Sequence, residues 1–116
     1  MILYHFKMLR KQPMKRSRKK GPTAAEQRHF ERVATMGCCV CGDPATIHHV
    51  TASVEGGRIT RSHQRVAPLC PAHHQIQWGP RESVEALGHR GFFAEYGIDL
   101  LALADMLWAT SERRAA

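Results

Sequence analysis

The chain has 116 residues, of which 43% are hydrophobic, so it has room for one modest domain with a small core. Its formal net charge of +7 is uneven: residues 1–20 contain eight Lys or Arg and no acid, whereas residues 21–116 contain nine basic and ten acidic residues. No run approaches the roughly 18–20 apolar residues of a membrane span, and the opening MILYHF is too short for a signal peptide, so we expect a cytoplasmic protein and exclude a membrane protein.

Residues 1–22 are predicted to form a disordered basic tail. A segment of like charges, broken by Pro13 and Pro22, cannot bury enough apolar surface to become ordered. The same charge predicts an arm that binds nucleic acid, because each phosphate that it neutralises releases counterions. We therefore expect the folded domain to span residues 23–116.

A helix is predicted between Thr23 and Gly37. Thr23 and Glu26 have the spacing of a capping box, and Gly37 is a natural helix terminator. An apolar stripe runs between them through Ala25, His29, Val33 and Met36, with Phe30 and Ala34 beside it. We expect His29 to be a partly exposed residue of this helix and not a ligand.

Two paired-ligand motifs follow, Cys38-x-x-Cys41 and Cys70-x-x-His73. This spacing is typical of a tetrahedral zinc site. Four cysteines in a small chain can also indicate a disulfide scaffold. The Cys-x-x-His motif instead favours reduced thiolates that bind a structural zinc. Cys39 lies outside the ligand spacing and is predicted to pack as a small hydrophobic residue.

Two short strands are predicted, over residues 45–50 and 66–69, on either side of a flexible basic loop at 51–65. The first strand carries His48 and His49. Because successive side chains of a strand point to opposite faces, these two histidines are expected to diverge. The strand must therefore bend if both are to serve one site.

A helix is predicted to begin at Pro71, directly after the second strand, with His73 and His74 projecting from it. A short turn or helix is predicted over residues 81–87. Beyond it we expect an aromatic core cluster of Phe92, Phe93 and Tyr96, ended by Gly97. The last helix is predicted to be capped by Asp99, with an apolar stripe formed by Leu100, Leu103, Ala104, Leu107 and Trp108.

Together these motifs resemble an HNH (ββα-metal) endonuclease, most closely the phage and prophage nucleases of the recombination-enhancement-function (Ref) type. The shared features are a basic N-terminus, an alanine-rich helix leading into GCxxCG, an IHH strand, PLCPxHH and a Gly-Phe-aromatic-Tyr-Gly segment, over roughly residues 22–108. The resemblance implies a small α+β fold, in which an HNH-like ββα-metal core with a structural zinc is flanked by helices. It also implies a metal-dependent hydrolase of DNA phosphodiester bonds, active in a bacterial host cell, with a recombinase filament on single-stranded DNA as a further partner.

The resemblance also assigns residues to roles. His49 would be the general base that deprotonates water, a role that suits an imidazole titrating near neutral pH. His48 and His74 would bind a catalytic divalent metal, Mg²⁺ or Mn²⁺ with Zn²⁺ as an alternative. The chain contains no asparagine, so the residue that orients the base in this family is replaced by His63 or by Gln64.

The third ligand of the catalytic metal is left open between several residues. Many relatives have a histidine four positions after the residue that corresponds to His74, where this chain has Trp78. Other relatives supply the ligand further on, and Glu85 stands at the matching position. Its carboxylate suits Mg²⁺ or Mn²⁺. Glu82 and His89 are the alternatives.

Two other functions are compatible with these motifs. The first is a non-catalytic, zinc-stabilised DNA-binding module, derived from a nuclease that has lost its activity. The second is a zinc-ribbon-like domain that binds a protein partner. His48, His49 and His74 favour the nuclease, because a binding module does not need three histidines beyond its zinc ligands.

Overall fold

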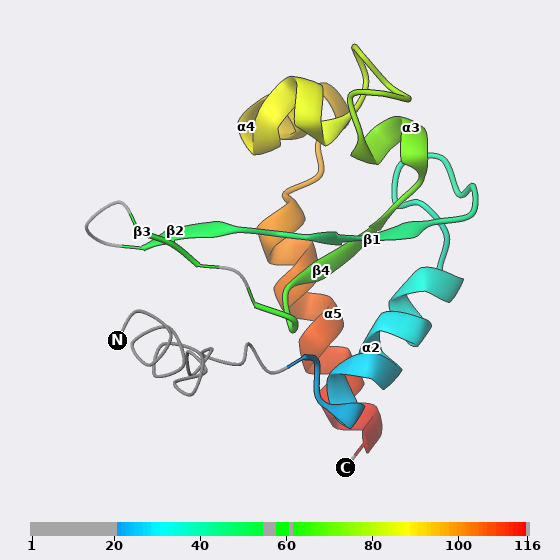
Figure 1. Ribbon diagram of the computed structural model, residues 1–116, viewed down its shortest axis with the longest axis vertical. Coiled ribbons are helices and arrows are strands. Elements are labelled where there is room, and N and C mark those ends of the chain that lie inside the picture. The colour runs from blue at the N-terminus through cyan, green and yellow to red at the C-terminus, as the bar shows by residue number, and fades with distance from the viewer. Residues whose placement is uncertain (1–20, 55–57, 61, 116) are drawn as a thin grey trace, which may run out of the picture.

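The computed structural model describes residues 21–54, 58–60 and 62–115, so the predicted tail falls almost entirely outside the described residues. The chain runs through α2 (Ala24–Thr35), β1 (Thr46–His49), β2 (Ala52–Val54), β3 (Arg58–Thr60), β4 (Val66–Leu69), α3 (Pro71–His74), α4 (Val84–Tyr96) and α5 (Leu100–Ala115) (Figure 1). The prediction of a small α+β fold is confirmed.

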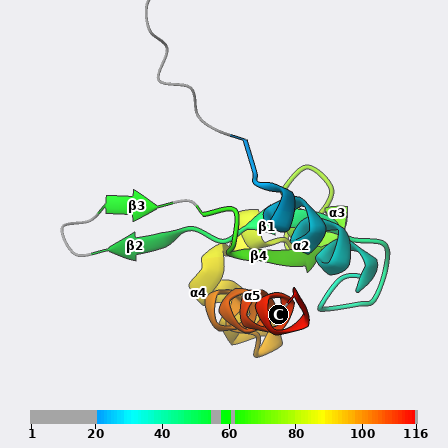
Figure 2. The ribbon, with the colours of Figure 1, turned by 90° about the horizontal axis from the view of Figure 1, so that it is seen from below.

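The strands form two antiparallel pairs. β1 pairs with β4, with Thr46 opposite Leu69 and His49 opposite Val66. β2 pairs with β3 in a hairpin that projects away from the helices (Figures 1 and 2). The two predicted strands are confirmed, but residues 51–65, predicted as a flexible basic loop, also contain the two strands of this hairpin. Its sequence favours strands, since ASV and RIT contain β-branched residues on either side of a glycine pair.

Helix α2 begins as its sequence predicts. The Thr23 hydroxyl accepts a hydrogen bond from the backbone N–H of Glu26, and the Glu26 carboxylate accepts one from the backbone N–H of Thr23. The helix ends at Met36 and Gly37, where Gly37 has a φ of 79°. A Cβ at Gly37 would lie 2.7 Å from the carbonyl oxygen of Gly42, so only glycine allows this close approach to the following turn.

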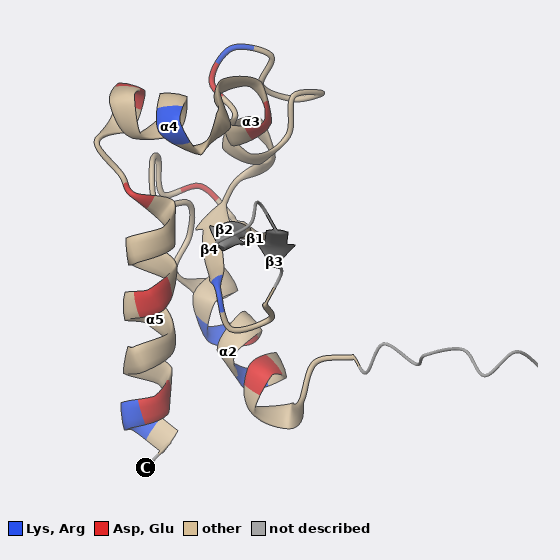
Figure 3. Cartoon of the chain, turned by 90° about the vertical axis from the view of Figure 1, so that its left-hand side faces the viewer, with Lys and Arg blue, Asp and Glu red and all other residues tan. Residues whose placement is uncertain are grey.

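The core lies between the β1–β4 pair and the helices that flank it (Figures 1 and 3). One small cluster joins Val33 of α2, Val66 of β4 and Leu107 of α5. A larger cluster extends through α4 and the first half of α5; its buried members are Cys38, Val50, Ala67, Leu69, Cys70, Val84, Phe92, Leu100 and Ala104. β1 and β4 contain no Lys, Arg, Asp or Glu, and the charged residues that Figure 3 colours lie on the helices and connecting loops.

Two burial predictions are wrong. His29 is only 1% exposed, because α5 packs over its side of α2: its Nδ1 lies 2.6 Å from the Ser111 hydroxyl, and its ring meets the edge of Trp108. Phe93 is 54% exposed, whereas its neighbour Phe92 is fully buried. Consecutive residues of a helix point about 100° apart, so the two rings cannot both face the core.

Helix α4 is interrupted within its length. Ser83 caps its first turn by accepting a hydrogen bond from the backbone N–H of Ala86, which agrees with the predicted helical segment at 81–87. Gly88 then has φ 73° and ψ 167°, far from helical values, and the helix resumes at once. This kink changes the direction in which His89 leaves the backbone.

Asp99 caps α5 as predicted, accepting a hydrogen bond from the backbone N–H of Ala102.

Candidate functional site

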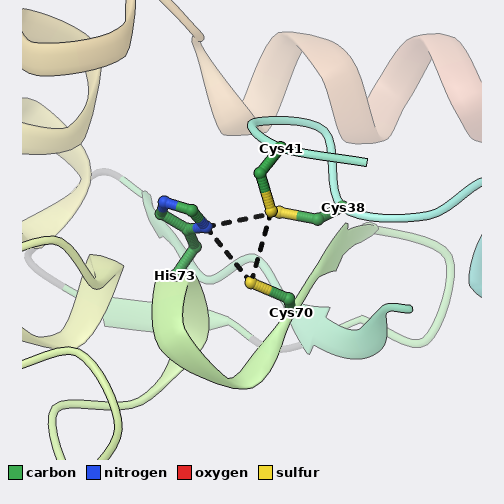
Figure 4. A group of neighbouring side chains, drawn as sticks. All are labelled: Cys38, Cys41, Cys70 and His73. Carbon is green, nitrogen blue, oxygen red and sulfur yellow. Dashed lines mark hydrogen bonds between the residues drawn. The ribbon is translucent and has the colours of Figure 1, made fainter. Parts of the chain in front are cut away.

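The four predicted zinc ligands meet at one point. Cys38 and Cys41 lie on the turn after α2, Cys70 directly follows β4, and His73 lies on α3. Their ligand atoms are all within 4.8 Å of one another, and Figure 4 shows the four side chains converging. All four cysteines of the chain are free thiols. This group can bind a metal such as zinc.

The spacing of the ligand atoms fits a tetrahedral ion. Zn–S and Zn–N bonds of about 2.3 and 2.05 Å imply separations of about 3.8 Å between two sulfurs and about 3.6 Å between sulfur and nitrogen. The Sγ atoms of Cys41 and Cys70 are 3.7 Å apart. The Nδ1 atom of His73 lies 3.6 Å from the Sγ of Cys38 and 3.1 Å from that of Cys70. Little movement is therefore needed to enclose an ion.

The turn that carries Cys38 is held by backbone hydrogen bonds. The N–H of Cys38 donates to the Asp43 carbonyl at 2.8 Å, and the N–H of Cys39 donates to the Pro68 carbonyl of β4 at 3.0 Å. Burial alone would raise the pKa of Cys38, but backbone N–H groups near its sulfur, including that of Val40 at 3.4 Å, lower it. The Cys39 side chain packs against the core as predicted, and burial raises its pKa to about 11.

A second group of side chains contains three histidines from three elements: His48 of β1, His74 of α3 and His89 of α4. The Nε2 atoms of His48 and His89 are 3.2 Å apart. The ring centroids of His48 and His74 are 5.0 Å apart, and the Nδ1 of His74 lies 2.9 Å from the hydroxyl of Thr46. We call these three residues the three-histidine cluster.

The surroundings of His48 and His74 favour the neutral form of their rings. Burial, reinforced by the neighbouring His74, His89 and His49, lowers the pKa of His48 to about 3. Burial also lowers the pKa of His74, although Glu85 opposes this shift. An imidazole must be neutral to bind a metal ion, so two of the three rings are in the form that binding requires at neutral pH.

His49 points away from the three-histidine cluster, as the alternation of a strand predicts. Its Nε2 lies 3.1 Å from the Nδ1 of His63, a residue of the segment that leads into β4. The rings of His49 and His63 each make a T-shaped contact with the ring of Phe30 of α2, at centroid distances of 5.7 and 5.8 Å. His63 thus occupies the position, beside His49, from which it can orient that ring.

Of the candidates for a third ligand, only His89 contacts His48 directly. The Glu85 carboxylate instead accepts a hydrogen bond of 2.8 Å from the backbone N–H of Ile76. The backbone of Glu82 is held by Tyr96, whose hydroxyl donates a hydrogen bond of 2.8 Å to the Glu82 main-chain carbonyl. The signal in the sequence that favours His89 is the glycine before it, whose conformational freedom allows the kink that directs the imidazole to β1.

Comparison with protein-family models, with curated proteins and with solved structures gives no match. Within the described part of the chain, no helix combines the length and apolar character needed to cross a membrane. The assignment of a function to this protein therefore rests on the geometry of its own residues.

Proposed function

We propose that this protein is a metal-dependent DNA endonuclease of the HNH (ββα-metal) type. The observation that carries the proposal is that His74 and His89 both contact His48 of β1. The next residue of the same strand, His49, contacts a fourth histidine outside the cluster, His63. The order β1, β4, α3, with the Cys/His group at the junction of β4 and α3, agrees with such a core.

The three-histidine cluster would hold the catalytic metal. Its donors are three imidazole nitrogens, which suit Zn²⁺ and similar transition metals best, Mn²⁺ less well, and Mg²⁺, an ion that prefers oxygen, least. When bound, such an ion stabilises the negative charge that develops on the oxygens of a phosphodiester during hydrolysis. His89 replaces Glu85 as the proposed third ligand, and Glu85 supports the cluster through its charge near His74.

His49 would act as the general base. In the proposed step its imidazole takes a proton from a water molecule while the water oxygen attacks phosphorus. The bond from phosphorus to the leaving oxygen breaks, and that oxygen receives a proton from solvent. His63 would hold the ring of His49 in one orientation and one tautomer, the function that the asparagine of the motif is expected to have.

The divergence of the two histidines constrains how DNA binds. His48 and His49 leave opposite faces of β1, and His49 is its last residue. A phosphodiester that uses both must therefore lie across the end of β1 and not on one of its faces. A recombinase filament on single-stranded DNA remains the partner that we propose from the Ref-type resemblance.

The test is a cleavage assay on zinc-loaded protein with supercoiled and single-stranded DNA, with Mn²⁺, Mg²⁺ or Zn²⁺ added in turn. We expect activity with Mn²⁺ or Zn²⁺ and its loss in His49→Ala, which should still fold and bind DNA. His89→Ala should lose activity through weaker metal binding, so that more Mn²⁺ restores part of it. His29→Phe, a histidine outside the site, is the matched control. Wild-type protein that is inert with every metal would leave the zinc-stabilised DNA-binding module as the function.

A further inference from the structure

The loop between α3 and α4 stands out from the body of the molecule (Figures 1 and 3) and exposes two large apolar side chains. Ile76 is 52% exposed and Trp78 is 59% exposed. Single exposed apolar residues are common on protein surfaces and need no explanation. Two of them in one short loop, directly after His74 of the three-histidine cluster, do call for one.

The loop is held in place at several points. Its N-terminal part is tied to α4 by the hydrogen bond from the backbone N–H of Ile76 to the Glu85 carboxylate. The N–H groups of Trp78 and Gly79 both donate to the Gln75 carbonyl, at 3.1 and 2.9 Å, which closes a turn around the tryptophan. Trp78 is thus displayed on a fixed backbone, so that little conformational entropy is lost when a ligand binds.

Gly79 fixes the loop against the helix that carries His74. It is buried, and a Cβ added to it would lie 1.7 Å from the carbonyl oxygen of Ala72 in α3. The loop backbone therefore packs directly on α3. Trp78 lies four positions after His74, so their Cα atoms are at most about 14 Å apart. If a DNA strand has a phosphate at the three-histidine cluster, a base only a few nucleotides along the same strand therefore lies within reach of the Trp78 indole.

We propose that Trp78 is a stacking platform for an unpaired nucleobase of the DNA strand whose phosphate lies at the three-histidine cluster. This inference rests on the proposed function and deepens it by naming the substrate class: single-stranded or locally unpaired DNA. An indole offers its face to any base, which explains how such a site can bind without reading sequence. A base inside a duplex is stacked on its neighbours and is not accessible to it.

The exposed side chains of the loop and the basic N-terminal segment of the chain support a nucleic acid as the occupant. Within residues 75–82 the charged residues are Arg81, which is exposed, and Glu82, which is partly buried, and the polar Gln75 and Gln77 are exposed. The excess of basic charge lies in residues 1–20, which contain eight Lys or Arg and no acid. A polyanion with apolar faces, which is what single-stranded DNA offers, complements this combination of cation, amides and indole.

The chain contains two tryptophans, Trp78 and Trp108, so Trp108→Phe leaves Trp78 as the single tryptophan, whose emission is excited selectively. In this background, zinc-loaded protein without added Mn²⁺ or Mg²⁺ is titrated with a deoxythymidine oligonucleotide and, separately, with a duplex. We expect the single strand to quench Trp78 emission and the duplex to quench it much less. In the wild-type background, Trp78→Ala should weaken single-strand binding roughly 5- to 150-fold, and Trp78→Phe should retain most of it.

Met106→Ala is the matched control, because Met106 is 55% exposed on α5 and has no part in the proposal. It should bind DNA as the wild type does, and zinc content and circular dichroism should show that every variant folds. Unaltered emission on saturation with single strand, or wild-type affinity in Trp78→Ala, would overturn the inference. So would a dimer that Trp78→Ala dissociates, since the loop would then bind a second copy of the chain.

The cleavage assay separates the two proposals. If the wild-type protein cleaves DNA and Trp78→Ala binds and cleaves DNA equally well, the proposed nuclease function stands and the stacking platform is refuted. If single-stranded DNA quenches the emission of Trp78 but the protein cleaves no DNA with any metal, the stacking platform stands and the proposed nuclease function is refuted.

Discussion

Replacing Gly88 by alanine tests whether the kink in α4 positions His89. Gly88 has φ 73° and ψ 167°, a region of backbone conformation that is essentially restricted to glycine. A Cβ at this position would meet no atom within 4 Å, so the substitution adds backbone strain without a steric clash. Strain of this kind is typically about 1–3 kcal/mol.

The chain can relieve this strain by moving the Gly88 backbone, which carries His89 away from its 3.2 Å contact with His48. Metal binding must then restore this contact and with it the backbone strain, so the free energy of binding becomes less favourable by the amount of that strain. We therefore expect Gly88→Ala to weaken binding at the three-histidine cluster by roughly 5- to 150-fold. Calorimetric titration with Mn²⁺ measures this affinity, with zinc already bound at the Cys/His group.

Gly97→Ala is the matched control. Gly97 also has a positive φ, 70°, and an added Cβ there would meet no atom within 4 Å, but it lies at the other end of α4. It should lower stability by about 1–2 kcal/mol and leave the Mn²⁺ affinity unchanged. The reasoning would be refuted if Gly88→Ala bound Mn²⁺ as the wild type does, or if Gly97→Ala lost as much affinity.

Three further predictions follow from the zinc group, the buried histidine and the basic tail. Cys70→Ala should lose stoichiometric zinc and unfold or aggregate, because so small a core cannot compensate; zinc analysis and circular dichroism test this, and a folded, zinc-free variant would contradict it. Burial, and to a smaller extent the charge of Arg32, lower the pKa of His29 in the folded protein. The unfolded chain therefore binds a proton at His29 more readily than the folded protein does. The free energy of unfolding should thus fall as the pH drops below about 6.5, by at most about 1.4 kcal/mol per pH unit. His29→Phe should flatten this dependence in denaturant titrations between roughly pH 5.5 and 7.5, and equal slopes would show that His29 is not responsible. Removal of residues 1–21 should weaken DNA binding and flatten its salt dependence with little change in the melting temperature; an unchanged salt slope would show that the tail does not contact phosphate.

The sequence by itself determined the features that depend on neighbouring residues. The group that can bind a metal such as zinc is recognisable because a Cys-x-x-Cys turn and a Cys-x-x-His helix start each place two donors on one side of the backbone. The capping box at Thr23 and the cap at Asp99 are equally local, since each side chain bonds a backbone group three residues away. The divergence of His48 and His49 follows from strand geometry alone.

Only the tertiary structure decided which residues from distant elements meet. The sequence favours Glu85 as a ligand and leaves His89 as an alternative, but in the structure the kink at Gly88 directs His89 toward β1, while Glu85 bonds the loop after α3. His29 looks like a surface residue of an amphipathic helix until α5 packs across it. Trp78 is exposed because its loop is fixed on α3 outside the core. These outcomes depend on how helices pack over tens of residues of intervening chain, which no local pattern encodes.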